Sequence, residues 1–494
     1  MYTLGIDLGS SSVKAAVLET ETGRCVGSAS FPENEMEISS PKPGWAEQHP
    51  ETWWENTLKA IRKSLSAGNI RSKEIAAVGI AYQMHGLVAV DKNLKSVRPS
   101  IIWCDSRAVE TGINLFRQAG EEKCLSNLLN SPGNFTFSKL VWVKNHEPEF
   151  FEKIHKIMLP GDYIAMKLTG EISTTITGLS EGILWNFRKH ALADFLLEAG
   201  GVDQSKIAQI VPVFGNQGEL SGKIADELGL KAGIPVSYRA GDQPNNAFSL
   251  NVLNPGEIAA TAGTSGVVYG VTDKVNYDPQ QRVNTFAHIN HNSGKPRFGI
   301  LLCINGTGIS NSWIKKMTGI SSYEEMDAIA GTTEPGADGL LFIPFGNGAE
   351  RMLGNRNPGA GFFNIDLKNH SRKHLFRAVQ EGVACAFRYG MEIMQKTGLD
   401  LNLIRAGKAN MFLSPLFCQT LSNLSGAEIQ LFDTDGALGA ARGAALGAGL
   451  YETPGHCFSN LSMLKVYRPQ SNLKVSYDEL FRKWTNHLNI LKSN

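Results

Sequence analysis

An acid and a hydroxyl that could act on a phosphate lie close together in residues 236–270. Residues 236–240 alternate as in a strand, and Asp242 follows directly after, where open sheets place their sites. A second strand at 258–261 runs into the turn Ala262-Gly263-Thr264-Ser265-Gly266, so we expect Asp242 and Thr264 at the ends of successive hairpins. Glycines in such a turn let backbone N–H groups approach an anion, which predicts a phosphate contact at Gly263 and Thr264.

The same arrangement opens the chain. Residues 2–17 predict a β-hairpin in which Asp7 precedes a turn made of Gly9, Ser10, Ser11 and Ser12. The turn amides and hydroxyls of Ser10, Ser11 and Ser12 suit a phosphate. This repetition suggests two similar halves that face each other across a cleft. We expect one acid from each half, Asp7 and Asp242, to meet one phosphate.

Seven stretches, taken in order, resemble the FGGY family of sugar kinases, and among its members the xylulokinases most closely. They are GIDLGSSSVKAAV (5–17), YQMHGLVAVDKN (82–93) with RPSIIWCDSRA (98–108), GDYIAMKLTGE (161–171), AGDQPNNA (240–247), TAGTSG (261–266), GLLFIPFGNGAER (339–351) and DTDGALGAARGAALGAG (433–449). The resemblance covers nearly all of the chain. It implies an α/β, two-domain actin-like ATPase (ribonuclease H-like) fold with a cleft between duplicated halves. The expected domains are 1–248, on the sugar and phosphate side, and 249–494, on the nucleotide side.

Composition agrees with a large enzyme that acts on small molecules. The 494 residues are 42% hydrophobic and 19% charged, and 48 basic residues against 47 acidic ones leave a net charge of +1. This small net charge creates no overall electrostatic field that would attract nucleic acid or an anionic membrane. The composition leaves open whether the protein forms a homodimer. The seven cysteines are scattered without a Cys-x-x-Cys pair, and no leader or membrane-spanning run is visible. We therefore expect a soluble protein of the reducing cytoplasm.

Periodicity and turn residues predict the other elements near these motifs. We expect strands at 24–31, 75–80 and 99–104, and helices at 51–67 and 161–170.

The strand at 75–80 leads to Gln83, Met84 and His85, which we call the 83–85 strip. The resemblance implies that its Met-His pair contacts the sugar, whereas glycerol kinases carry Arg-Glu at these positions. Gln243, beside Asp242, joins the implied sugar contacts. The alternative is that His85 is a hydrogen-bonded core histidine.

Three further segments have weaker signals. Trp45 and Gln48 resemble a loop that borders the sugar pocket in pentulose kinases, although Trp45 is equally suited to anchor a long loop. Asp105 and Arg107 suit a local ion pair. The hydroxyl-rich stretch 173–184 is expected to form a wall of the sugar pocket.

The nucleotide contacts are implied by the resemblance. Gly308 opens a helix that flanks the nucleotide in relatives, and Gly407 and Asn410 occupy the adenosine loop. This loop has lost one glycine of the relatives' pair, so it also fits a simple helix start. Small residues fill 436–449, which predicts a close-packed helix with no chemistry.

The chemistry follows from these parts. A sugar hydroxyl needs a proton acceptor as the γ-phosphoryl group of ATP arrives, and Asp242 is the expected base. Asp7 is expected to orient Mg²⁺ through water, because Mg²⁺ prefers oxygen ligands and keeps its hydration shell. The expected reaction is the ATP-dependent conversion of D-xylulose to D-xylulose 5-phosphate, with ribulose or sedoheptulose as alternative substrates.

A second class of function is an actin- or chaperone-like ATPase, which has the phosphate hairpins but lacks the 83–85 strip. A dinucleotide dehydrogenase is excluded, because no Gly-x-Gly-x-x-Gly follows a strand at the start of the chain.

Overall fold

The computed structural model describes residues 1–70 and 72–493, and it is an α/β structure with two compact units. Unit 1 comprises Met1–Asn251, Phe286–Arg297 and Thr434–Leu461, and unit 2 comprises Val252–Thr285, Phe298–Asp433 and Ser462–Asn494. The chain thus passes between the units several times. This division differs from the single boundary predicted between residues 248 and 249, because two later segments return to unit 1.

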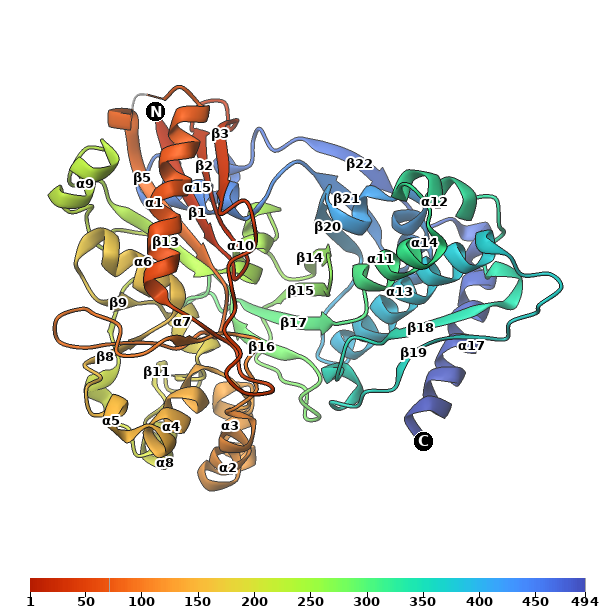
Figure 1. The fold of residues 1–494 in the computed structure, drawn as a ribbon, viewed down its shortest axis with the longest axis horizontal. Helices are drawn as coiled ribbons and strands as arrows, with labels where there is room; N and C mark the ends of the chain where they lie inside the picture. The colour runs from red at the N-terminus through yellow and green to blue at the C-terminus, as the bar shows by residue number, and fades with distance from the viewer. Residues whose placement is uncertain (71, 494) are drawn as a thin grey trace. The chain divides into compact units, whose positions relative to one another are not determined.

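Unit 1 is built on a five-stranded sheet (Figure 1). In spatial order its strands are β13 (Val236–Gly241), β5 (Ile75–Tyr82), β1 (Tyr2–Leu8), β2 (Val13–Glu19) and β3 (Cys25–Phe31). β1 and β2 form an antiparallel hairpin, and β5 runs parallel to both β1 and β13. The predicted strands at 24–31, 75–80 and 236–240 and the opening hairpin are confirmed.

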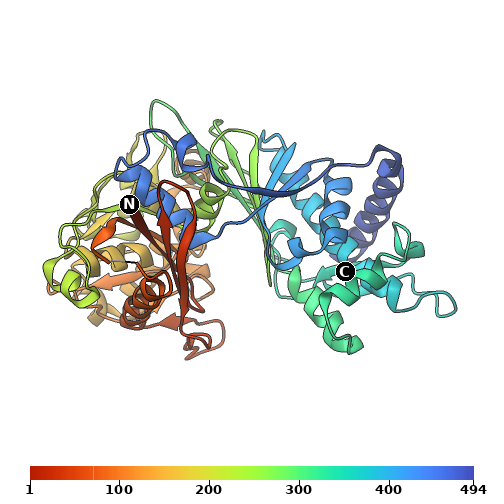
Figure 2. The same ribbon diagram turned by 90° about the horizontal axis from the view of Figure 1, so that it is seen from above.

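The two faces of β1 contact different helices because successive side chains alternate. Leu4, Ile6 and Leu8 enter a core with α1 (Pro50–Ala67). On the other face the Thr3 hydroxyl donates to the Ala441 carbonyl of α15 (Gly436–Gly447) at 2.9 Å. Figures 1 and 2 show this late helix, in blue, beside the red strands of the sheet.

Glycines allow α15 to approach the sheet backbone. A Cβ atom at Gly5 would lie 1.9 Å from the Ala437 carbonyl oxygen, and one at Gly79 would lie 2.1 Å from the Ala440 carbonyl oxygen. The close-packed helix predicted over 436–449 is therefore present, and it belongs to unit 1.

The remaining elements of unit 1 are helices and short strand pairs. The helices are α2 (Val109–Ala119), α3 (Glu121–Leu128), α4 (Thr136–His146), α5 (Pro148–Phe151), α6 (Pro160–Thr169), α7 (Ile176–Glu181), α8 (Asp194–Gly200), α9 (Gly222–Leu228), α10 (Asp242–Ser249) and α16 (Pro454–Cys457). The strand pairs are β4 (Glu47–Gln48) with β7 (Ser100–Ile101), β6 (Val88–Val90) with β8 (Lys156–Met158), β9 (Ser173–Thr174) with β12 (Gln209–Ile210), and β10 (Trp185–Asn186) with β11 (Ala191–Leu192). The helices predicted at 51–67 and 161–170 correspond to α1 and α6.

Unit 2 contains a two-stranded hairpin and a seven-stranded sheet, except that residues 286–287 of one edge strand belong to unit 1. The sheet order is β16 (Asn284–Ala287), β17 (Phe298–Ile304), β15 (Gly266–Thr272), β14 (Glu257–Ala262), β20 (Leu403–Gly407), β21 (Glu428–Phe432) and β22 (Met463–Tyr467). The hairpin is β18 (Leu341–Phe345) with β19 (Gly359–Phe363), and the helices are α11 (Gly308–Thr318), α12 (Tyr323–Ala330), α13 (Arg372–Gln395), α14 (Pro415–Ser425) and α17 (Lys474–Ser493). Within the described part of the chain, no helix is long and apolar enough to cross a membrane.

Two expectations about the acids and one about a strand are wrong. Asp242 begins helix α10 instead of lying on a hairpin, because β13 is followed by a helix. Asp7 and Asp242 both belong to unit 1, so they do not come from separate halves. β7 ends at Ile101, because the chain then turns and the Asp105 N–H donates to the Ile102 carbonyl at 3.2 Å.

The contact between α15 and the sheet predicts that a methyl group at Gly79 is costly. We expect Gly79→Ala to lower the free energy of unfolding by about 1–3 kcal/mol, because backbone must move to relieve the clash with Ala440. Gly222→Ala is the control, since a Cβ there meets nothing within 4 Å. Denaturant unfolding of both variants measures the difference, and equal stabilities would contradict the close-packing argument.

Candidate active site

Asp7 and Asp242 lie at the same edge of the unit 1 sheet. β1 and β13 both run parallel to β5, with Asp7 level with Ala81 and Gly241 level with Tyr82. One strand separates them, so their backbones are roughly 10 Å apart. The structure therefore brings together the two acids that the sequence analysis selected.

Both acids are partly exposed at the sheet edge, and they interact through their charges. Burial, followed by the charge of Asp7, raises the pKa of Asp242 to about 7, although hydrogen bonds from Gln243 oppose the shift. Burial, followed by the charge of Asp435, raises the pKa of Asp7 to about 6, and Lys14 opposes this shift. The sheet edge thus holds carboxyl groups that titrate near neutral pH.

The N-terminus of α15 completes this edge with residues that the sequence analysis missed. Asp435 caps the helix by accepting from the Leu438 N–H at 2.9 Å, and it forms an ion pair with Lys14. A Cβ atom at Gly436 would lie 2.1 Å from Asp7 Oδ2. An aspartate before a helix is a visible capping signal, but its place beside Asp7 is not visible in the sequence.

The serine turn between β1 and β2 is anchored from both sides. The Gly9 N–H donates to the Ser12 carbonyl at 3.0 Å, and the Met36 N–H donates to the Ser11 carbonyl at 2.7 Å. Gln48 Nε2 donates to the Ser10 carbonyl at 2.7 Å. Ser11 is exposed, and Ser10 and Ser12 are partly exposed, so the turn is both fixed and accessible.

The 83–85 strip leaves the end of β5 beside this edge. Gln83 and Met84 are buried, and the Gln83 N–H donates to the Leu8 carbonyl at 2.7 Å. His85 is partly exposed and has a positive φ of 62°. Gln243, the second residue of α10, is also partly exposed.

Glu181 is a further acid that the sequence analysis did not select, although it lies in the stretch 173–184. A Cβ atom at Gly241 would lie 2.7 Å from Glu181 Oε2 and 2.6 Å from Met84 Cγ. Burial raises the pKa of Glu181 well above its ordinary value, and the Asp242 charge adds to this shift. Glycine at 241 therefore makes room for Glu181 and Met84 beside Asp242.

Of the predicted nucleotide residues, Ser10, Ser11 and Ser12 belong to unit 1, and the other five lie at one region of unit 2. The turn between β14 and β15 accepts two hydrogen bonds from the start of α11: the Gly308 N–H donates to the Gly263 carbonyl at 2.8 Å, and the Ile309 N–H donates to the Thr264 carbonyl at 3.2 Å. A Cβ atom at Gly263 would lie 3.5 Å from Asn410 Nδ2. Gly407 ends β20, whose Ala406 is level with Ala260 of β14. A short 3₁₀ helix, Asn410–Leu413, does begin in this loop.

Glu350 is a buried acid of unit 2 that the sequence analysis did not select. Its Oε1 atom accepts from the N–H groups of Asn305 and Gly306 at 2.9 and 3.3 Å, and its side chain is buried. Burial raises the pKa of Glu350 to about 7. This side chain therefore fixes the turn that leads into α11.

Asp105 and Arg107 form the ion pair that the sequence suggested. Arg107 Nη2 lies 2.7 Å from Asp105 Oδ2, and its Nη1 lies 2.7 Å from Glu47 Oε1. The guanidinium carbon lies 3.7 Å from the centre of the Trp45 ring. Through its contacts with Glu47 and Trp45, the Asp105–Arg107 pair thus holds the 41–50 loop in place.

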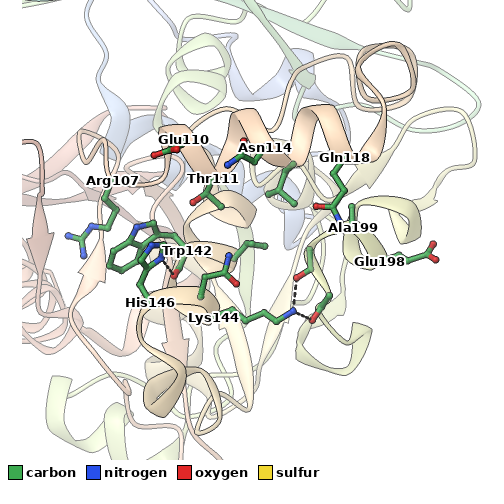
Figure 3. Close-up of a pocket in the computed structure, with 15 residues that line it drawn as sticks. Arg107, Glu110, Thr111, Asn114, Gln118, Trp142, Lys144, His146, Glu198 and Ala199 are labelled. Atoms are coloured by element: carbon green, nitrogen blue, oxygen red, sulfur yellow. Dashed lines mark hydrogen bonds between the residues drawn. The ribbon is translucent and has the colours of Figure 1, made fainter.

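A separate cavity of about 590 Å³ lies between α2, α4 and α8 (Figure 3). None of the predicted site residues lines it. Lys144 donates to the carbonyls of Gly200 and Gly201 at 2.9 and 2.6 Å, and the His146 ring stacks on Trp142 at 4.6 Å. Lys144 and His146 are thus engaged within the protein, so we assign this cavity no part in the site.

The carboxylates suit a magnesium ion that keeps most of its water. Among the described residues, no group of three or more His, Cys, Asp and Glu side chains is arranged to hold a metal ion. Mg²⁺ does not need such a cage, because one or two carboxylates, waters and substrate phosphates satisfy it. The mutually repelling Asp7 and Asp242 match that donor set.

The chain is similar to known carbohydrate kinases over nearly its whole length. The sequence model described as "FGGY family of carbohydrate kinases, N-terminal domain" matches residues 2–249, and the corresponding C-terminal domain matches residues 258–450. The xylulose kinase of Escherichia coli (strain K12) is 30% identical over 494 residues, which cover 98% of each chain.

Solved structures of similar fold include kinases with different named substrates. The xylulose kinase from Rhodospirillum rubrum is 24% identical, has a TM-score of 0.88, and covers 99% of each chain. The gluconate kinase from Lactobacillus acidophilus is 21% identical with a TM-score of 0.89, and covers 100% of this chain and 98% of that one. At these identities the similarity concerns the fold alone.

The raised pKa of Asp242 predicts a pH-dependent stability. The ordinary pKa of this carboxyl group is 3.8, and the pKa in the folded protein is about 7. At pH values between these two, folded Asp242 keeps a proton that the unfolded chain releases. The contribution of Asp242 to stability is therefore fully present below pH 3.8 and is lost as the pH rises through about 7. We expect Asp242→Asn to melt at a higher temperature than wild type at pH 8, with a smaller difference at pH 5.

Thermal melts at both pH values measure this effect. Asp226→Asn is the control, because Asp226 is exposed on α9 and its substitution should change both melts equally. A wild-type protein more stable than Asp242→Asn at pH 8 would contradict the desolvation of this carboxyl group.

Proposed function

Because the chain belongs to the FGGY family of carbohydrate kinases, we propose that this sugar kinase converts D-xylulose to D-xylulose 5-phosphate, with ATP as the phosphoryl donor. The observation that carries the proposal is the sheet edge of unit 1, where Asp242 lies beside the 83–85 strip. The 30% identity to the xylulose kinase of Escherichia coli supports the choice of sugar. Family membership removes the actin- or chaperone-like ATPase as an alternative.

In this proposal Asp242 is the general base. A sugar hydroxyl is a weak nucleophile, so its proton must be accepted while the bond to phosphorus forms. A pKa of about 7 for Asp242 suits this role at neutral pH, because about half of the carboxyl groups are then ionised and each is basic enough to take the proton. Its position at the start of α10 holds the carboxylate at the end of β13.

The other residues of unit 1 bind and orient. Gln83, Met84, His85 and Gln243 contact the sugar, and Ser10, Ser11 and Ser12 donate to phosphate oxygens. Asp7 would hold Mg²⁺ through water, and the ion would stabilise negative charge on the phosphates.

The residues of unit 2 bind the nucleotide. Gly263 and Thr264 offer a turn with close backbone approach, which suits phosphate oxygens. The hydrogen bond from Gly308 to this turn aligns the start of α11 with the turn. Gly407 and Asn410 lie at the neighbouring strand end, where they contact the adenosine.

Removal of the proposed base tests the mechanism. We expect Asp242→Asn to lower kcat by about 100-fold or more while ATP binding is retained, because the amide keeps the shape and cannot accept the proton. Coupled detection of ADP with D-xylulose, together with nucleotide titration, measures both quantities. Asp226→Asn serves as the matched control. Retention of more than about a tenth of wild-type turnover would remove Asp242 from this role.

The sugar itself is tested by a panel of acceptors. We expect D-xylulose to have the highest kcat/KM among D-xylulose, D- and L-ribulose, L-xylulose, sedoheptulose, gluconate and glycerol. His85→Ala is expected to raise the KM for D-xylulose about tenfold or more, because a polar sugar group loses its partner. If gluconate or glycerol has the highest kcat/KM, the xylulose proposal is overturned and the family assignment stays intact.

A further inference from the structure

His85 has an unusual backbone conformation that its neighbours hold in place. Its φ of 62° lies in the left-handed region, which residues other than glycine seldom adopt because of steric strain. Such strain is found where surrounding groups determine the conformation, often at functional sites. The contacts around His85 show which groups do so.

Two buried ionisable side chains contact the backbone polar groups of His85. The His85 N–H donates to Glu181 Oε1 at 3.2 Å, and Lys139 Nζ donates to the His85 carbonyl at 2.8 Å. Lys139 also donates to the Ile102 carbonyl at 3.0 Å. Both sides of the strained residue are therefore bound by side chains from α7 and α4.

The imidazole ring is oriented by the same segment. Its Nδ1 atom lies 3.1 Å from the Glu181 carbonyl oxygen. A carbonyl only accepts hydrogen bonds, so Nδ1 carries the proton and the lone pair of the neutral ring is on Nε2. Phe135 and Phe286 pack against the ring, with centroids 4.7 and 5.4 Å away. Both the tautomer and the plane of the ring are thus determined.

Burial of these two ionisable groups is costly for the fold. Lys139 and Glu181 are about 0% and 1% exposed. Burial lowers the pKa of Lys139 to about 7 and raises the pKa of Glu181 well above its ordinary value. Apolar side chains of similar size would avoid this cost, which indicates that the pair serves more than packing.

We propose that Glu181 and Lys139 are positioning residues that hold His85 in its left-handed conformation and thereby set how tightly the enzyme binds its sugar. This inference rests on the proposed function, because it requires that His85 contacts the sugar. Neither side chain takes part in the chemical step. Their effect is therefore on the sugar's KM and passes through His85.

A double-mutant cycle between Lys139 and His85 tests the inference. We expect Lys139→Met to raise the KM for D-xylulose about tenfold with little change in the KM for ATP, because the side chain keeps its volume and loses its donor. In the His85→Ala background the same substitution should change the KM for D-xylulose less than about twofold. Equal effects in the two backgrounds would show a general structural role and overturn the inference.

Glu181 supplies a second, independent cycle if Lys139→Met does not fold. Glu181→Gln keeps an oxygen that accepts from the His85 N–H, so its KM should stay within about threefold of wild type. Glu181→Leu removes that acceptor and should raise the KM about tenfold, again only when His85 is present. Equal KM values for the two Glu181 variants would overturn the role of this carboxyl group.

Failure of the proposed function gives a different result. If His85→Ala leaves the KM of every sugar in the panel unchanged, His85 does not contact the sugar, and the sugar-binding proposal fails. If His85→Ala raises the KM but the cycles are additive, only the positioning inference fails. Melting temperatures of all variants show which of them remain folded.

Discussion

Close backbone contact between α15 and the central sheet is the constraint on which unit 1 depends. Gly5 and Gly79 leave no room for a side chain, since a Cβ atom at Gly5 would lie 1.9 Å from a carbonyl oxygen of the helix. Tight packing of this kind transmits small displacements instead of absorbing them. It brings residues 434–461 back to a sheet formed by the start of the chain, and it places Asp435 beside Asp7. The small residues of α15, which carry no chemistry themselves, thus shape the acidic edge.

Desolvated charge is the second feature of that edge. Asp7, Asp242 and Glu181 all have raised pKa values, and burial is the largest cause for each of them. Groups of this kind do not stabilise a fold when they are ionised, so their presence at one sheet edge fits a site where proton transfer and cation binding occur. Lys139 is buried beside the 83–85 strip, where its Nζ donates to the His85 carbonyl.

The fold and the choice of sugar have different origins. Structures of a xylulose kinase and of a gluconate kinase resemble this chain about equally, with TM-scores of 0.88 and 0.89. The fold alone therefore does not select a sugar, and in the proposed function a few side chains would distinguish the acceptors. The proposed function assigns this part to the 83–85 strip at the end of β5, where His85 contacts residues distant in sequence.

The sequence by itself determined the features that local patterns encode: the opening hairpin with its serine turn, the strand that ends before Asp242, and the glycine turn that contains Thr264. Alternation of side chains and turn chemistry specify these elements within a few residues. Only the tertiary structure decided that Asp242 and Asp7 share one unit, that Asp435 lies beside Asp7, and that Glu181 holds His85. These relations depend on how helices pack against the sheet and on the desolvation that follows. Residue spacing along the chain encodes neither the packing nor the desolvation, because the contacts join segments that lie tens to hundreds of residues apart.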